Sequence, residues 1–472
     1  MKRSYFCLIS ILILSCILLC GCSDDANGDY QSTLFDTGSV HKIDITLSDE
    51  DWDDLLDNPT DKTKYKADIV IDGEELKDVA FATKGNSSLY FVADDPKSDR
   101  YSFKVTFGKY VDGQTYHGLD KLSLNNNFCD ATYMKDYFCY ELFRKAGVPA
   151  PLTSYVWLRV NGRDRGLYLA VEDEENSFLD RAYDGEGVIY KPESKSVGLT
   201  SEDIKNIKEN GLSMPKDPRG TDLVYTYDDP ESYPDIFENA ETDADETNAR
   251  EVISALKDLS EEKKLENCLD TKEIISFFAA HNFVLNYDSY TGAMLHNLVL
   301  HDNNGKLSLI PWDYNLAFCT FVPGTGREVL KDVTNRINQG IDTPLISASE
   351  DRRPMWKWIA DDEKYLAEYH DALDSLVSDY FESGEFDSRF NELYEMLLPY
   401  VEKDPTAFYS ADEYTKGCET MRQFCNLRAE SIRKQLDGDL PAVSGDQPDR
   451  DKVDASDIDI TDMGAFVYAA GN

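Results

Sequence analysis

Three polar side chains within residues 283–318 have the types and the spacing that chemistry on a phosphate requires. Asp288 follows an apolar run of helical character, and Asn297 and Asp313 stand at the outer ends of two short strand-like runs. An Asn-Asn-Gly turn at 303–305 joins those runs, which predicts a β-hairpin whose outer ends lie side by side. Phosphoryl transfer on Mg²⁺ uses one carboxylate to orient the acceptor hydroxyl, and an amide oxygen and a second carboxylate to hold the metal on the triphosphate. The segment therefore predicts a phosphoryl-transfer site.

The elements that must position these side chains differ between the two halves of the chain. Strand patterns dominate up to about residue 190, and Asp72-Gly73 and Asn161-Gly162 are hairpin signals. After residue 249 the pattern is mainly helical, and the three polar residues lie near the junction. We therefore predict an α+β fold with a β-rich N-terminal lobe and a helical C-terminal lobe. Strands are expected at 40–47, 67–71, 79–83, 101–107, 154–160, 166–171 and 187–190, and helices at 131–146, 176–183, 249–259, 271–287, 355–359, 362–382, 385–401 and 411–435.

The composition indicates a globular body with a strongly acidic surface. The chain has 472 residues, enough for one large two-lobed domain or two ordinary ones. Its 90 acidic and 48 basic residues give a formal net charge of −42. Such a surface repels nucleic acid, so we expect no nucleic-acid partner, and it favours basic protein partners. A soluble surface suited to a salty exterior is an equally good interpretation of this charge.

The first 22 residues have the pattern of a targeting segment. Lys2 and Arg3 precede a mostly apolar run at 6–19, which is too short for an ordinary membrane span. The run ends in Leu-Cys-Gly-Cys at 19–22, which matches the bacterial lipobox. We expect cleavage before Cys22 and lipidation of its thiol, which would make the chain an extracytoplasmic, membrane-anchored lipoprotein of a bacterium. The alternative is a plain signal peptide with a chance cysteine.

Composition also predicts the boundaries of the folded part. Residues 23–36 are polar and are expected to form a tether, followed by the main domain at 37–436. Residues 194–249 are rich in Asp, Glu, Pro and Asn and read as an acidic insertion with partial order. Residues 437–472 are acidic with few apolar positions, so we predict a disordered tail.

Two other chemistries lack their sequence patterns. His281, His296 and His301 are close in sequence but do not have the spacing of a zinc hydrolase, and no GxSxG elbow is present. The six cysteines beyond Cys22 do not form a CxxC cluster, so isolated buried thiols are expected rather than a zinc site.

Several motifs, taken in order along 40–435, resemble the CotH family of spore-coat kinases, which are atypical protein kinases. Lys-Gly-Asn-Ser-Ser at 84–88 resembles the family's RGNSS block, and Val-Asn-Gly-Arg at 160–163 with Gly-Leu-Tyr at 166–168 and Glu172 resembles VNGxYxGLYxxE. The most specific match is the stretch containing Asp288, the His-Asn pair at 296–297, the hairpin and Pro-Trp-Asp at 311–313.

The resemblance implies a protein-kinase-like fold and a role for each matching residue. Asp288 is expected to be the catalytic acid that orients or receives the acceptor hydroxyl, Asp313 a metal ligand, and Asn297 a residue that completes the metal shell. It further implies ATP as cofactor with Mg²⁺ or Mn²⁺. The implied acceptors are Ser or Thr of secreted, surface or spore-coat proteins, with basic, Ser-rich proteins favoured by the chain's own charge.

The same resemblance suggests a nucleotide-binding set. The turn after Lys84, including Ser87, is expected to present N–H groups and hydroxyls to phosphate oxygens, although an ordinary polar loop has the same composition. Glu172 is expected to pair with a nucleotide-binding lysine, and the sequence does not decide between Lys104 and Lys191.

Two departures from the family pattern favour a second hypothesis. Lys84 replaces the usual arginine, which removes the guanidinium fork, and Asn315 stands where many members have an aspartate. A neutral amide at 315 would weaken a second metal site. The alternative function is therefore a non-catalytic pseudokinase that acts as a surface or spore-coat assembly protein.

Overall fold

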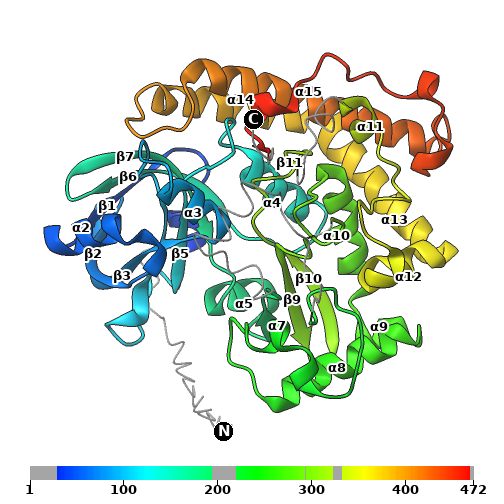
Figure 1. Cartoon of the computed structure of the whole chain (residues 1–472), viewed down its shortest axis with the longest axis horizontal. Coiled ribbons are helices and arrows are strands. Elements are labelled where there is room, and N and C mark those ends of the chain that lie inside the picture. The colour runs from blue at the N-terminus through cyan, green and yellow to red at the C-terminus, as the bar shows by residue number, and fades with distance from the viewer. Residues whose placement is uncertain (1–28, 194–218, 293, 323–331, 468–472) are drawn as a thin grey trace, which may run out of the picture.

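A computed structural model of the chain describes residues 29–193, 219–292, 294–322 and 332–467. The N-terminal half is a closed barrel of seven strands in the order β1-β2-β3-β4-β5-β7-β6, seen at the left of Figure 1. Neighbouring strands are antiparallel, except that β1 and β6 close the barrel in parallel. The strands are β1 (His41–Thr46), β2 (Tyr65–Ile71), β3 (Glu74–Lys84), β4 (Ser102–Thr106), β5 (Lys121–Asn125), β6 (Thr153–Val160) and β7 (Arg163–Glu172).

The barrel forms because its strands alternate between apolar and polar positions and turn at residues that tolerate positive φ. In β1 the side chains of Ile43 and Ile45 are buried, whereas those between them are more exposed. The predicted hairpin turns at 72–73 and 161–162 are both present, with left-handed φ at both central residues. These are the turns whose twist matches that of paired strands.

The second half packs helices around a three-stranded sheet of order β10-β9-β8. Helix α10 lies at its centre; it is buried on nearly all sides and contacts α13, α4, α12 and β10 (Figure 1). The elements are α4 (Lys135–Lys145), α5 (Asn176–Tyr183), β8 (Val188–Tyr190), α7 (Pro234–Phe237), α8 (Glu246–Ser260), α9 (Leu265–Cys268), α10 (Thr271–Val284), β9 (Leu298–Asn303), β10 (Lys306–Pro311), β11 (Phe321–Val322), α11 (Val333–Ile337), α12 (Pro354–Asp361), α13 (Glu363–Leu376) with a π-helical end (Val377–Glu382), α14 (Glu385–Val401), α15 (Ala411–Leu436) and β12 (Phe466–Val467).

This architecture confirms the α+β class, with a β-rich N-terminal region and a helical C-terminal region. Helices predicted at 176–183 and 385–401 have those bounds, and α15 extends one residue beyond the prediction. Closure of the strands into a barrel was not predicted, since it depends on the parallel pairing of β1 with β6 across more than 100 residues. A closed barrel also differs from the open sheet of an ordinary kinase N-terminal lobe.

The predicted tether at 23–36 is wrong for its second half. Residues 30–33 form the short helix α1 (Tyr30–Thr33), and Tyr30, Leu34 and Phe35 are buried against the barrel. The Tyr30 hydroxyl donates to Glu172 at 2.7 Å. The predicted signal peptide at 1–22, with its lipidation site Cys22, lies outside the described residues. Within the described parts of the chain, no helix is long and apolar enough to cross a membrane.

The predicted disorder of the C-terminal tail is wrong for residues 437–467. Leu440, Ile460 and Met463 are fully buried, and the last described residues form β12, which pairs in parallel with β11. Aspartates alternate there with widely spaced apolar residues, so the average composition concealed a packed segment. Of the acidic insertion, 194–218 lies outside the described residues, and the remainder contributes Tyr233 and Ile236 to the core.

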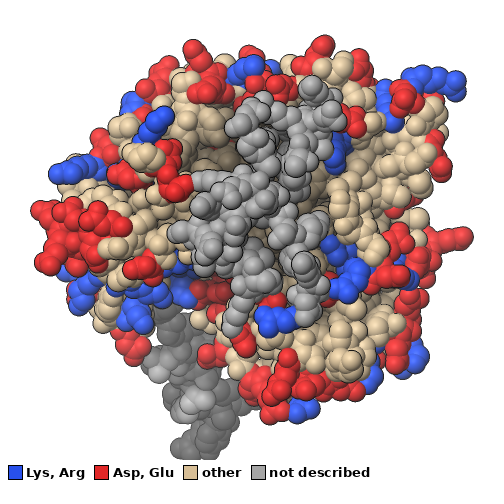
Figure 2. Space-filling model, viewed as in Figure 1, with Lys and Arg blue, Asp and Glu red and all other residues tan. Residues whose placement is uncertain are grey.

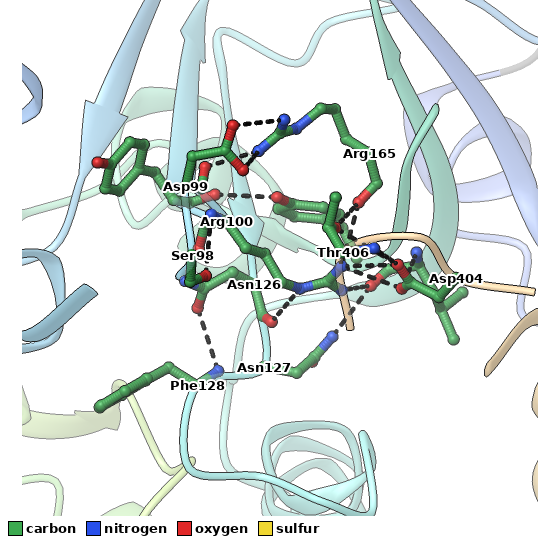
Figure 3. A network of polar contacts seen from close by, with 12 residues as sticks. Ser98, Asp99, Arg100, Asn126, Asn127, Phe128, Arg165, Asp404 and Thr406 are labelled. Atoms are coloured by element: carbon green, nitrogen blue, oxygen red, sulfur yellow. Dashed lines mark hydrogen bonds and ion pairs between the residues drawn. The ribbon is translucent and has the colours of Figure 1, made fainter. Parts of the chain in front are cut away.

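A buried polar network joins the helical half to the barrel (Figure 3). Arg100 is fully buried and pairs with Asp404 at 3.0 Å, and it also donates to Thr406 and to the backbone carbonyl of Asn126. Gly166 packs directly on Asp404, where a Cβ would overlap the carboxylate, which explains the glycine of the Gly-Leu-Tyr motif. This motif therefore has a structural role at the junction.

Candidate functional site

A cavity of about 430 Å³ lies between the barrel and the helical half, within the range of small-molecule sites. Its barrel side comes from β3, β4 and the loop at 85–88, and its helical side from the residues around α10 and the β9–β10 hairpin. Seven of the eight residues predicted to act in catalysis, metal binding or cofactor binding line it: Lys84, Ser87, Lys104, Lys191, Asp288, Asn297 and Asp313.

Asp288 follows the C-terminal end of α10, which stops at Val284 with Leu285 in the left-handed conformation. The Asn297 side-chain amide donates to Asp288 Oδ2 at 3.0 Å and to its backbone carbonyl at 3.2 Å. Burial raises the pKa of Asp288 well above its usual value, the charge of Asp313 raises it further, and the hydrogen bond from Asn297 opposes both. The carboxyl group is thus oriented by one neighbour and sensitive to the charge of another.

The β9–β10 hairpin places Asn297 and Asp313 at one end, as predicted. Its register pairs Leu298 with Pro311, and the turn has left-handed φ at Asn304 and Gly305. Asn297 and Asp313 themselves have φ of 54° and 55°, a region that Asn and Asp tolerate better than most residues.

The Asp313 carboxylate lies on the cavity wall. Its backbone N–H donates to the Tyr140 hydroxyl at 2.9 Å, which fixes the main chain. No side chain or backbone group among the described residues donates a hydrogen bond to its carboxylate, or to the amide oxygen of Asn297. Two oxygen donors are therefore available on the wall of one cavity.

Asp136, on the first turn of α4, is an acid of this site that sequence reasoning missed. It accepts hydrogen bonds from the Tyr314 backbone N–H at 2.7 Å and from the Asn125 side chain at 3.2 Å. Burial raises its pKa to about 7, with further contributions from the charges of Asp313 and Asp130. In the sequence it resembles any acid at a helix start, so no local pattern distinguishes it.

The donor set fits a hard divalent cation shared with a nucleotide. Mg²⁺ is usually held by one or two carboxylates together with substrate phosphates, and it prefers oxygen ligands. Asp313 and Asn297 supply such oxygens, with Asp136 close to Asp313. Among the described residues, no group of three or more His, Cys, Asp or Glu side chains could hold a metal ion alone. A metal here would therefore depend on phosphate oxygens for the rest of its shell.

Five lysines line the same cavity, and three of them, Lys84, Lys104 and Lys191, are the predicted ones. Lys104 pairs with Asp173 at 2.7 Å, and Lys84 donates to the Asn125 side chain at 2.7 Å. The ammonium groups of Lys84 and Lys191 lie 5.2 and 4.1 Å from the centre of the Trp312 ring. Burial lowers the pKa of Lys84 to about 8, although the charge of Asp313 opposes this shift. This concentration of cations in a strongly acidic protein fits an anionic ligand.

The predicted pairing of Glu172 with Lys104 or Lys191 is wrong. Glu172 is buried away from the cavity, where it pairs with Arg181 at 2.6 Å. The next residue, Asp173, pairs with Lys104 instead. Successive side chains of a strand point to opposite faces, so an error of one residue at the end of β7 moved the prediction to the wrong side of the sheet.

The loop at 85–86 precedes the short helix α3 (Ser87–Ala93), whose first residue is Ser87. Its Asn86 side chain accepts a hydrogen bond from Lys62 at 3.0 Å and donates one to Glu193. The loop is therefore fixed against both the barrel and the segment after β8. Asn315 also lines the cavity, and its side chain donates to the Phe128 carbonyl at 3.1 Å, so it has a structural partner in this chain.

Acidic side chains spread over the face shown in Figure 2, interspersed with Lys and Arg. The cavity is lined by five lysines together with the acids Asp130, Asp136, Glu193, Glu241, Asp288 and Asp313. The geometry thus defines a class of protein in which oxygen donors and lysines share a cavity between two halves of the molecule.

Comparison with known proteins places this class in a family. The model of the family described as CotH kinase protein matches residues 81–432, so the chain belongs to the CotH family. It is 19 % identical over 398 residues to "Inner spore coat protein H" of Bacillus subtilis (strain 168), covering 81 % of this chain and 96 % of that protein. It is also 27 % identical over 95 residues to "Inner spore coat protein H-like protein" of the same organism, covering 20 % of this chain and 29 % of that protein.

Proposed function

We propose that this chain is an exported, ATP- and Mg²⁺- or Mn²⁺-dependent protein kinase of CotH type that phosphorylates Ser or Thr. The observation that carries the proposal is the convergence of Asp288, Asn297 and Asp313 in one cavity with Lys84 and Lys104. A kinase must bring together a group that orients the acceptor, oxygen ligands for the metal, and cations for the phosphates, and this cavity has all three.

In this mechanism Asp288 acts on the acceptor hydroxyl. Asn297 donates a hydrogen bond to Oδ2 of Asp288, which leaves its other oxygen to accept the hydrogen bond of a Ser or Thr hydroxyl. As the new bond between the acceptor oxygen and phosphorus forms and the bond to the leaving phosphate breaks, Asp288 takes the proton of the hydroxyl. The carboxyl must therefore be ionised when the acceptor binds.

The other residues hold the nucleotide. Asp313 and Asn297 would bind the divalent cation, which, when bound, neutralises charge on the triphosphate. Lys84, Lys104 and Lys191 would contact phosphate oxygens. Lys104 is held in place by Asp173, as a nucleotide-binding lysine is in kinases, although the acid differs from the one predicted.

Charge and family membership support a proposal for the acceptor and the compartment. A chain of net charge −42 attracts basic substrates, so we propose basic, Ser-rich proteins of the exterior or of a spore coat. We further propose that the chain is exported and anchored through lipidated Cys22, and that it has no nucleic-acid partner. The name of the B. subtilis relative concerns a spore coat, which agrees with this class of acceptor.

The test is transfer of labelled phosphate from ATP to a basic Ser-rich peptide and to the protein itself, with Mg²⁺, with Mn²⁺ and with EDTA. Metal-dependent incorporation that is lost in Asp313→Ala, but not in Asp53→Asn on the exposed face of α2 (Asp49–Asp57), would support the proposal. Absence of both transfer and a nucleotide-induced thermal shift would contradict it. A thermal shift without transfer would instead support the pseudokinase hypothesis, which the neutral Asn315 in the cavity favours.

A further inference from the structure

The C-terminal end of the chain forms part of the cavity wall. After α15 the segment 437–467 returns over the helical half, and its last described residues reach β11 (Figure 1). Phe466 lines the cavity together with Phe321, which comes eight residues after Asp313. The end of the chain thus lies beside the loop that carries the predicted metal ligand, although about 150 residues separate them in sequence.

Phe466 contacts both sides of the cavity. Its backbone N–H donates to the Thr320 carbonyl at 2.9 Å, and its ring stacks on Phe321 with centroids 6.1 Å apart. The same ring packs edge-on against Phe91 of α3, on the barrel side, at 5.2 Å. One aromatic side chain therefore links the segment after Asp313 to the helix that begins at Ser87.

A single buried ammonium group makes a second link. Lys135 Nζ is fully buried and donates to the carbonyls of Asn315 and Gly464 and to the Thr320 hydroxyl, at 3.1, 2.5 and 3.0 Å. A buried charge is costly unless its hydrogen bonds are satisfied. Two of these partners belong to the loop after Asp313 and one belongs to the C-terminal segment, so the loop and the segment are held around the same group.

The loop 313–320 is consequently fixed at both ends. At its start, the backbone N–H groups of Asp313 and Tyr314 donate to Tyr140 and Asp136. At its end, Thr320 and Phe321 are fixed by Lys135 and by the parallel pairing with β12. The first set of contacts is local to the site. In the second set, the Lys135–Thr320 hydrogen bond comes from α4, whereas the pairing with β12 and the contacts of Phe466 exist only if the C-terminal segment is in place.

We propose that residues 463–467 are a positioning element for Asp313, and that Phe466 is the side chain through which they act. This inference rests on the proposed kinase function and deepens it. Neither Phe466 nor Lys135 supplies a ligand to the metal. They set the position of the loop that supplies a metal ligand, so their removal weakens metal binding more than nucleotide or acceptor binding.

The test compares Phe466→Ala with the conservative Phe466→Tyr and with Val443→Ala, an exposed position on the same segment. For Phe466→Ala we expect the Mg²⁺ concentration that gives half-maximal transfer to rise about tenfold, as for supporting residues of metal sites. The KM for the acceptor should stay the same. Phe466→Tyr keeps an aromatic ring and should have the wild-type Mg²⁺ dependence. Val443→Ala should have the same Mg²⁺ dependence as wild type.

Hydrogen exchange in the absence of nucleotide separates this inference from the kinase proposal. The amides of 313–322 should exchange faster in Phe466→Ala and in a chain ending at Ala465, with the amides of α10 unchanged. Unchanged exchange in 313–322, or an unchanged Mg²⁺ dependence in a folded Phe466→Ala protein, would overturn the inference. If wild type transfers no phosphate but the exchange result holds, the kinase proposal fails while the positioning of the loop stands.

Discussion

Two buried groups of charges in this molecule have opposite organisation. At the junction of barrel and helices, Arg100 and Asp404 are both fully buried, and the guanidinium uses each of its three nitrogens as a donor (Figure 3). In the cavity, Asp288 and Asp136 both have raised pKa values because they are buried near the charge of Asp313. One group is fully paired, and the other holds acids whose charges oppose one another.

This difference distinguishes residues that stabilise the fold from residues that are positioned to bind a ligand. A buried ion pair with its hydrogen bonds satisfied gains nothing from a further partner. Acids held close together with perturbed pKa values are typical of sites whose ligand supplies the missing charge. The Gly-Leu-Tyr motif belongs to the first group and the Pro-Trp-Asp motif to the second, although both are landmarks of the same family resemblance.

The largest effect is expected for Asp313→Ala. Removing a metal ligand should cost several kcal/mol of transition-state stabilisation, so transfer should fall about a thousandfold or more. For the stability readout we use Asp313→Asn, because asparagine tolerates the left-handed backbone at this position. The melting temperature of this ligand-free variant should stay the same or rise, because the charge that raises the pKa of Asp288 and Asp136 is gone. Labelled-phosphate transfer and thermal unfolding measure the two properties. A variant that loses stability would mean that Asp313 belongs to the structural group.

Substitution at the junction of barrel and helices should lower the stability of the protein, in contrast to substitution of Asp313. Arg100→Ala leaves the Asp404 carboxylate buried without its partner, and such a change costs about 3–5 kcal/mol of the free energy of unfolding. Urea unfolding of the variant measures it, with Arg159→Ala at a half-exposed ion pair as the matched control. A loss as small as that of the control, within about 1 kcal/mol, would contradict the structural role.

Because of Lys84, we expect kcat/KM for ATP to depend on pH in the alkaline range. Its pKa of about 8 means that its positive charge is lost as the pH rises above that value. Because kcat/KM reports on the free enzyme, kcat/KM for ATP should fall towards a tenfold loss per pH unit above 8. Lys84→Arg should remove this fall, since arginine stays protonated. The same decline in both proteins would exclude Lys84 as its cause.

The smallest expected effect is that of Asp136 on the pH dependence of the free energy of unfolding. Its folded-state pKa of about 7 exceeds the value of the unfolded chain, so the folded state binds the extra proton between these values. The free energy of unfolding of the ligand-free protein should therefore decrease as the pH rises from 5 to 8. Asp136→Asn should flatten this part of the profile by an amount on the order of 1 kcal/mol. A wild-type profile that rises through this range would contradict the assignment.

The sequence was sufficient where the determinants are local. Asn-Gly and Asp-Gly turns predicted the hairpins, and the hairpin at 303–305 placed Asn297 beside Asp313. The apolar periodicity predicted the long helices, with errors of a few residues at their ends.

Contacts between distant segments could not be predicted in this way. The closure of the barrel, the approach of Asp136 to Asp313 and the return of the C-terminal segment to β11 all depend on tertiary packing. The error at Glu172 had a different cause: the strand was correctly found, but its register relative to the cavity was wrong by one residue.

The role of Asp288 can be tested by the rate of phosphate transfer by wild type and by Asp288→Asn, with ATP binding measured on both proteins. The substitution keeps the shape of the side chain and removes its ability to take a proton. We predict a fall in kcat of about 10²–10⁴-fold with ATP affinity unchanged. Equal rates in the two proteins would contradict the role of Asp288, and with it the proposal that this cavity transfers phosphate.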